Sequence, residues 1–203
     1  WPILIGQLAT VGMNVADVAM AGHASAQDLA GVSLGVSLWH IAIVTLMGLL
    51  MAVNPIVAQH VGAGARERIA PIVRQALWKA LGAGLLAMGL LNLVATVVLT
   101  RLHAEPVVLV LAREFVAVIS FALPAFCAFR VLYGYSASIN QTRPMMVIAL
   151  GALALNIVVN WLLVFGNLGF PRLGGVGCAW ATLLCVWFEL AVMVWWIRRT
   201  PVY

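Results

Sequence analysis

Residues 29–58 read LAGVSLGVSLWHIAIVTLMGLLMAVNPIVA, a stretch without a single Asp, Glu, Lys or Arg. A helix crosses the hydrocarbon core of a bilayer with about 20 mostly apolar residues, and this stretch is longer than that. Apolar runs of this length are typical of transmembrane helices and exceed those of helices buried in small soluble domains. We therefore predict that the chain spans a membrane.

The composition of the whole chain supports the same prediction. Of its 203 residues, 65% are apolar and 8% are charged, whereas soluble domains carry about 25% charged residues. So few charges exclude a compact soluble domain, and the high hydrophobicity excludes intrinsic disorder. The net charge of +5 comes from scattered single residues rather than a basic patch, so we expect no nucleic-acid partner.

Six segments are long and apolar enough to cross a bilayer, and none alternates with the period of a β-strand. Short polar or glycine-rich breaks separate them, and Asp28 is expected to be the N-cap of the second helix. The sequence thus predicts an all-α integral membrane protein, a bundle of six transmembrane helices. The predicted spans are residues 2–21, 29–58, 72–100, 107–137, 144–166 and 176–197.

Basic residues predict the orientation of these spans. The loops after the second, fourth and sixth spans, counted with Arg74 at the start of the third span, hold six arginines, and the loops after the first, third and fifth hold two. Since Lys and Arg accumulate in cytoplasmic loops, we place the even-numbered loops and the N-terminus in the cytoplasm. The chain opens at Trp1, within an apolar run and without an initiator Met, and we interpret it as a fragment of a longer chain.

Small residues inside the spans are expected to pack against neighbouring helices. Cys127, Cys178 and Cys185 lie in apolar runs and form no CxxC pair, so we interpret them as core residues. Gly31 and Gly35 form a GxxxG pattern, which either allows close approach of another helix or is a chance pairing.

Polar residues in the spans follow single helix faces. In the first span Gln7, Thr10, Asn14 and Asp17 are spaced by 3, 4 and 3, which keeps them within about 80° of arc. A polar stripe on a membrane helix must face protein or water, because lipid cannot solvate it. We therefore predict a central aqueous cavity. Polar faces in four other spans carry Ser33, Ser37 and His40; Arg130, Tyr133 and Asn140; Asn156 and Asn160; and Cys178, Thr182, Cys185 and Glu189.

Asp17 is the first candidate for function, since an ionised carboxylate inside a membrane costs several kcal/mol unless it is solvated, paired or protonated. Either it is a capping or interfacial acid near the turn at residues 22–28, or it binds a proton or a hard cation. In the second case Asn156, Asn160 and Thr182 would supply neutral oxygen ligands for Na⁺, or would tune the carboxylate for H⁺.

Arg130 and Glu189 form a second charged set. Glu189 lies nine residues before Arg198, and Arg130 ten before Asn140, so both lie about 14 Å from the cytoplasmic end. Similar depth predicts a structural ion pair between the fourth and sixth spans. The alternative is that Glu189 is a second proton carrier.

The sequence contains no pattern that indicates an enzyme. The four histidines do not cluster, and HExxH, P-loop, GxGxxG and GxSxG motifs do not occur. We expect no catalytic residue, no cofactor, and no metal site beyond Na⁺ at Asp17.

Several segments resemble the multidrug and toxic compound extrusion (MATE) family, in its NorM-like branch. The resemblance covers essentially the whole chain, and it rests on the order and spacing of its segments rather than on one motif. The segments are Pro2, Gln7, Gly12, Asp17 and Met20-Ala21-Gly22; Asn54-Pro55, Ala58-Gln59 and Gly62-Ala63-Gly64; Arg130, Asn140 and Pro144; Leu155-Asn156, Asn160 and Gly166; and residues 173–179 with Ala181-Thr182.

The resemblance implies a twelve-helix transporter of two six-helix lobes, of which this chain would be the N-terminal lobe. Such transporters export cationic drugs against Na⁺ or H⁺ entry. Carried over, Asp17 matches the first-helix acid, Asn156 and Asn160 the fifth-helix pair, and Thr182 the sixth-helix hydroxyl of an N-lobe cation site. Pro2 matches a proline that permits bending of the first helix. Some branches carry Asp where this chain has Asn160, so a single carboxylate remains here.

The resulting prediction is the N-lobe of a multidrug efflux antiporter of a bacterial inner membrane, with Na⁺ or H⁺ as coupling ion. Gln7, Asn14 and Tyr133 would line a cavity for small cationic or amphipathic drugs. Membrane lipid and a C-terminal lobe of the same chain are the other expected partners. One alternative is a lipid or polysaccharide flippase, whose cavity should be strongly cationic, whereas only Arg130 lies deep here. Another is a non-transporting scaffold, which would lack the polar stripes.

Overall fold

A computed structural model of the chain describes residues 1–64, 66–169 and 172–201, and within these ranges all regular structure is helical. Two single turns of 3-10 helix, Arg66–Arg68 and Asn167–Gly169, accompany the α-helices. The predicted all-α class is therefore confirmed. The α-helices are α1 (Pro2–Ala24), α2 (Ala26–Leu50), α3 (Val53–Gly62), α4 (Ile69–Arg101), α5 (Pro106–Ser120), α6 (Leu123–Ser138), α7 (Arg143–Phe165) and α8 (Gly175–Arg199).

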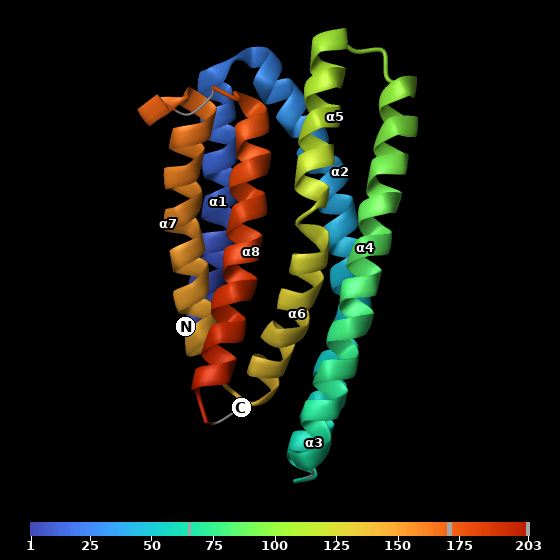
Figure 1. Cartoon of the computed structure of the whole chain (residues 1–203), viewed down its shortest axis with the longest axis vertical. Coiled ribbons are helices and arrows are strands. Elements are labelled where there is room, and N and C mark those ends of the chain that lie inside the picture. Colours follow the sequence, from blue (N-terminus) through green and yellow to red (C-terminus); the bar gives the residue numbers. More distant parts are fainter. Residues whose placement is uncertain (65, 170–171, 202–203) are drawn as a thin grey trace.

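The helices cover each predicted span and run lengthwise through one elongated bundle (Figure 1). By length and composition five of the described helical segments can cross a membrane, with α2 and α3 taken together, or six if the bent pair α5–α6 is one span. The hairpin formed by α2, α3 and α4 extends beyond the other helices at one end (Figure 1). The start of α1 and the end of α8 lie toward that same end (Figure 1).

Two of the predicted spans are interrupted rather than continuous. α5 and α6 meet at an angle of 46°, and Pro124 stands in the first turn of α6. α2 likewise ends before α3, whose first turn contains Pro55. A proline has no N–H to donate to the carbonyl four residues earlier, and its ring collides with that carbonyl. The spans predicted over residues 29–58 and 107–137 thus each consist of two helical segments.

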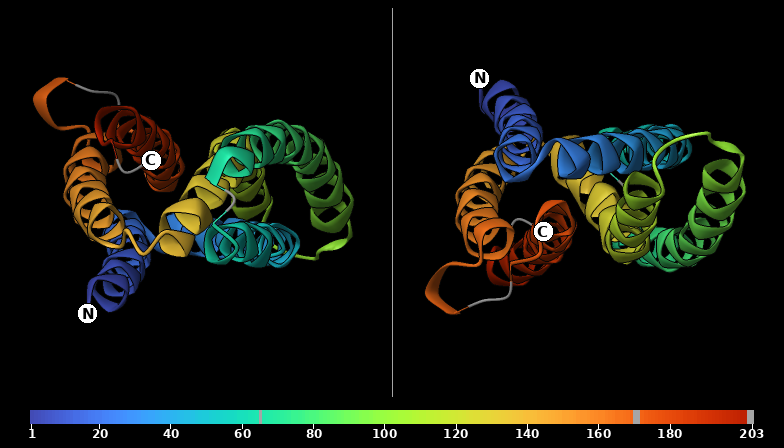
Figure 2. Two further views of the ribbon diagram at one scale, coloured as in Figure 1. Left: turned by 90° about the horizontal axis from the view of Figure 1, so that it is seen from below. Right: turned by 90° about the horizontal axis from the view of Figure 1, so that it is seen from above.

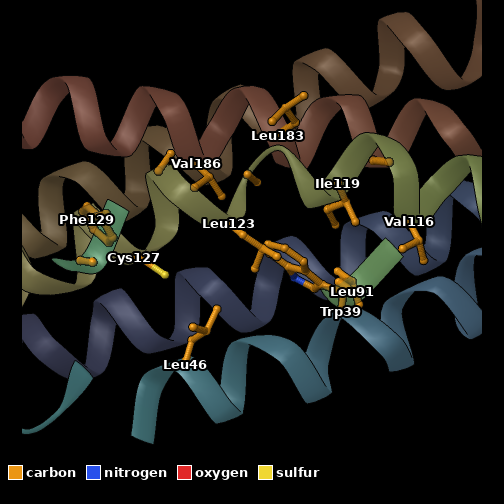
Figure 3. Close-up of a cluster of buried hydrophobic side chains, with 14 of the residues drawn as sticks. Trp39, Leu46, Leu91, Val116, Ile119, Leu123, Cys127, Phe129, Leu183 and Val186 are labelled. Atoms are coloured by element: carbon orange, nitrogen blue, oxygen red, sulfur yellow. The ribbon is translucent and has the colours of Figure 1, made fainter. Parts of the chain in front are cut away.

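The helices form two groups, α1 with α7 and α8, and α2 to α6 (Figure 2). An apolar core of buried side chains holds the second group together and extends to α8 and, with fewer residues, to α1 and α7. Figure 3 shows part of this core, in which Leu183 and Val186 of α8 belong to one cluster with Leu123 at the α5–α6 break. The two groups are thereby joined along α8.

Glycines on α2 allow α5 to pack closely, which supports the first of the two interpretations of the GxxxG pattern. A Cβ atom at Gly31 would lie 2.8 Å from Cβ of Leu111, and a Cβ atom at Gly35 would collide with the ring of Phe115. The three cysteines are buried and free, which confirms their interpretation as core residues.

The N-cap of α2 is Ser25 and not Asp28, which corrects the prediction. Ser25 is extended, with φ −167° and ψ 162°, and its Oγ accepts the Asp28 N–H at 2.9 Å. Asp28 instead occupies the third position of the helix. Its Oδ2 accepts the Ser25 hydroxyl at 2.7 Å, and its Oδ1 accepts the N–H of Gly175 at 2.8 Å. Asp28 thus connects the first turns of α2 and α8.

Candidate cation site and central cavity

The Asp17 carboxylate on α1 is the centre of a polar cluster made by three helices. Its Oδ1 accepts N–H groups from Asn156 at 3.1 Å and from Asn160 at 2.6 Å, both on α7. Its Oδ2 accepts the hydroxyl of Thr182, on α8, at 3.0 Å. The structure therefore brings together all four residues that the sequence assigned to a cation site. Asp17 is 9% exposed, so this carboxylate faces protein.

The four-residue spacing on α7 brings both amide donors to the Asp17 carboxylate. Asn156 and Asn160 lie one turn apart on the same face of α7, both fully buried. Asn160 Nδ2 also donates to Asn156 Oδ1 at 3.1 Å, so the two amides orient each other. One turn before Thr182, the Cys178 thiol lies 3.5 Å from the backbone carbonyl of Asp17, which packs α8 directly against α1.

One oxygen of the cluster has no partner. Among the described residues, Asn160 Oδ1 is buried and accepts no hydrogen bond. An unsatisfied buried acceptor costs about 1–3 kcal/mol, so such groups call for an explanation. A carboxylate beside neutral amide and hydroxyl oxygens is the ligand type that hard cations prefer. The cluster therefore has the composition to take up a hard monovalent cation or a proton.

Asp17 and Thr182 of this cluster line a cavity of about 190 Å³ between α1, α2, α6, α7 and α8, and the two asparagines lie buried behind them. Gln7, Asn14 and Tyr133, the residues assigned to a substrate cavity, all line it. Sequence reasoning missed much of its apolar lining, because hydropathy does not distinguish a residue facing a cavity from one in a core. The missed residues include Met13, Trp39, Met47, Phe126 and Phe129.

Arg130 and Glu189 both line this cavity, but in the described part of the chain they form no direct ion pair. The guanidinium carbon of Arg130 lies 4.9 Å from the ring centroid of Tyr133, one turn further along α6. The expectation of a direct pair therefore needs correction, and the guanidinium lies over the Tyr133 ring instead. An electrostatic interaction between the two charges remains.

Of the other residues on the predicted polar faces, Thr10, His40 and Cys185 also line the cavity, whereas Ser33 and Ser37 do not. The hydroxyls of Ser33 and Ser37 donate to carbonyls one turn earlier in α2. Pro2 occupies the first turn of α1, and its role in bending stays a prediction. Within the described ranges, no three His, Cys, Asp or Glu side chains come close enough to form a metal site together.

The chain is similar to a known protein family and to several curated proteins. The family model described as MatE matches residues 2–162. The chain is 39% identical over 202 residues to the multidrug resistance protein PmpM of Pseudomonas aeruginosa, covering 100% of this chain and 42% of the relative. It is 37% identical to the probable multidrug resistance protein NorM of Chromobacterium violaceum, covering 97% of this chain and 42% of the relative.

A solved structure supports the same fold. The outward-facing structure of a multidrug resistance MATE family transporter of the MOP superfamily superimposes with a TM-score of 0.87 at 21% identity. It covers 98% of this chain and 44% of the solved chain. The chain thus spans about two fifths of the length of the relatives it matches.

Proposed function

Since the chain belongs to the MatE family, we propose that it forms the N-terminal lobe of a multidrug efflux antiporter in a bacterial inner membrane. The observation that carries this proposal is the Asp17 carboxylate, held by three donors in the wall of a cavity. The names of the relatives support drug export, and the remaining C-terminal lobe would complete the transport path.

In the proposed mechanism, Na⁺ or H⁺ binds at Asp17 and neutralises it. In a low-dielectric cavity the loss of one negative charge weakens the attraction for a cationic drug, so ion and drug favour different states. Neutralisation also changes what the donors from α7 and α8 bind, which shifts α1 against these helices. Ion entry would thereby release the drug, because each ligand lowers the affinity for the other.

The charges of the cavity support a cationic substrate over a phosphate-bearing one. Its lining carries two carboxylates, Asp17 and Glu189, and one guanidinium, Arg130. A flippase for phospholipid or a lipid-linked sugar would need a cationic cavity, and the excess here is negative. A scaffold without transport would have no use for a polar cavity in the bilayer.

Basic residues support a cytoplasmic location for the end of the bundle where α1 starts and α8 ends. Arg68, Arg143, Arg198 and Arg199 lie in or beside segments at that end (Figure 1). At the opposite end, α4 finishes with Arg101. This asymmetry agrees with the accumulation of Lys and Arg in cytoplasmic loops.

Transport by the full-length protein in proteoliposomes tests the proposal. With ethidium as the cationic probe, an imposed Na⁺ or H⁺ gradient should drive ethidium against the direction of ion flow. Collapsing the effective gradient with an ionophore should stop net movement, and the gradient that works identifies the coupling ion. Ethidium movement that responds to neither gradient would refute ion-coupled export.

A further inference from the structure

We propose that Glu189 is a second cation-binding carboxylate in the cavity, which contacts the positively charged group of the transported drug while Asp17 holds the coupling ion. The inference rests on the proposed transport function and deepens it. It assigns the two negative charges of the cavity to two different ligands.

The spacing along α8 separates the two carboxylates. Glu189 lies seven residues after Thr182, whose hydroxyl donates to Asp17. Seven residues make almost two full turns, which returns Glu189 to the same helix face about 10 Å further along the axis. Both residues line the cavity. The second carboxylate therefore follows the first along one wall, too far away to share a bare ion with it.

The two carboxylates also differ in how accessible they are to a cationic ligand. Asp17 is nearly enclosed, and its two oxygens accept three hydrogen bonds from neighbouring side chains. Glu189 is half-buried, and none of the described residues donates a hydrogen bond to it. Even a half-buried carboxylate without hydrogen-bond donors costs free energy unless a counter-charge accompanies it. Among the described residues, the charge that acts on Glu189 is that of Arg130, whose guanidinium lies over the Tyr133 ring and forms no direct pair with the carboxylate.

The side chains that share this cavity fit a lipophilic organic cation. Tyr133, Phe126, Phe129 and Trp39 line it together with methionines. Aromatic faces attract cations through their quadrupoles and offer flat apolar contact to the rest of the molecule. An ammonium or phosphonium centre near Glu189 could then replace Arg130 as the counter-charge. The chemical class assigned to this subsite is a permanent, aromatic or alkylated organic cation.

The test measures ethidium affinity of the purified full-length protein by fluorescence, with and without the coupling ion. E189Q should weaken ethidium binding at least tenfold, while the remaining binding should still respond to the coupling ion. E189D, which keeps the charge, should recover much of the affinity. E114Q is the matched control, since Glu114 is exposed on α5 outside the cavity, and it should bind ethidium as the wild type does.

Arg130 gives an independent measurement that does not need a folded E189Q protein. R130Q removes the competing positive charge and should tighten ethidium binding severalfold. E189Q protein that binds ethidium within twofold of the wild type would overturn the inference, and so would R130Q protein with unchanged or weaker binding. In D17N protein, ethidium affinity should become independent of the coupling ion. If D17N keeps that dependence, the proposed function itself fails, whatever E189Q shows.

Discussion

Replacing Asp17 by Asn in the full-length transporter should abolish ion-coupled drug export and leave the protein folded. An asparagine has nearly the same shape, and its carbonyl can still accept the amides of Asn156 and Asn160. It carries no charge, so neither Na⁺ nor H⁺ would bind there with useful affinity. In a host that lacks its own efflux pumps, D17N should give the drug susceptibility of cells with an empty vector, although the protein accumulates normally in the membrane.

The control for this substitution is E105Q. Glu105 is exposed at the start of α5 and contacts Gln27 at 3.3 Å, away from the cavity. Resistance should remain at the wild-type level in this variant. Wild-type resistance conferred by D17N would remove Asp17 from the transport mechanism.

Of all these substitutions, Gly84→Leu should lower the free energy of unfolding the most. A Cβ atom at Gly84 would lie 2.5 Å from the Cα of Pro124 and 2.9 Å from the carbonyl oxygen of Leu123. These are backbone atoms at the α5–α6 break, so no flexible side chain can move aside. Overpacking lowers the free energy of unfolding by about 1–3 kcal/mol and occasionally more. Because the contact at Gly84 is with rigid backbone, we expect the loss for G84L to reach or exceed the upper end of this range.

The matched control for Gly84 lies on the same helix. A Cβ atom at Gly82 would meet nothing within 4 Å, so G82L should melt close to the wild-type temperature. Thermal unfolding of the detergent-solubilised full-length protein should show G84L melting far below both, or failing to yield folded protein. Equal melting temperatures for the two leucine variants would show that α4 does not pack against the break as described.

The fold was largely predictable because a bilayer imposes simple constraints. A spanning segment must be long, apolar and helical. The length and hydropathy of residues 29–58 and 144–166 directly predict such segments. The breaks at Pro55 and Pro124 were not predictable in the same way, because hydropathy is indifferent to a proline in an apolar run and neighbouring helices can satisfy the freed carbonyl. The N-cap was missed since Ser25 and Asp28 are both good N-cap residues, and only backbone geometry separates them.

The candidate site was predictable as far as helix periodicity reaches. The spacing of Asn156 and Asn160 places them on one face, and the cost of a lone Asp17 in the membrane requires that polar partners lie near it. Which helices become neighbours came from the family resemblance and not from periodicity. For Arg130 and Glu189, similar depth in the membrane was insufficient to predict a direct ion pair. Depth leaves the rotation of each helix and the side-chain conformation undetermined. The guanidinium lies over the Tyr133 ring instead.

Release of the coupling ion on drug binding is the measurement that tests the central claim most directly. Ethidium is added to the purified full-length protein while displaced ²²Na⁺ and protons released into weakly buffered solution are both counted. If Asp17 binds the ion that the drug displaces, the wild type should release close to one Na⁺ or H⁺ per ethidium bound, as reciprocal coupling through one carboxylate requires. D17N should bind ethidium and release neither. Release from D17N equal to that of the wild type would place the coupling ion elsewhere and contradict the account.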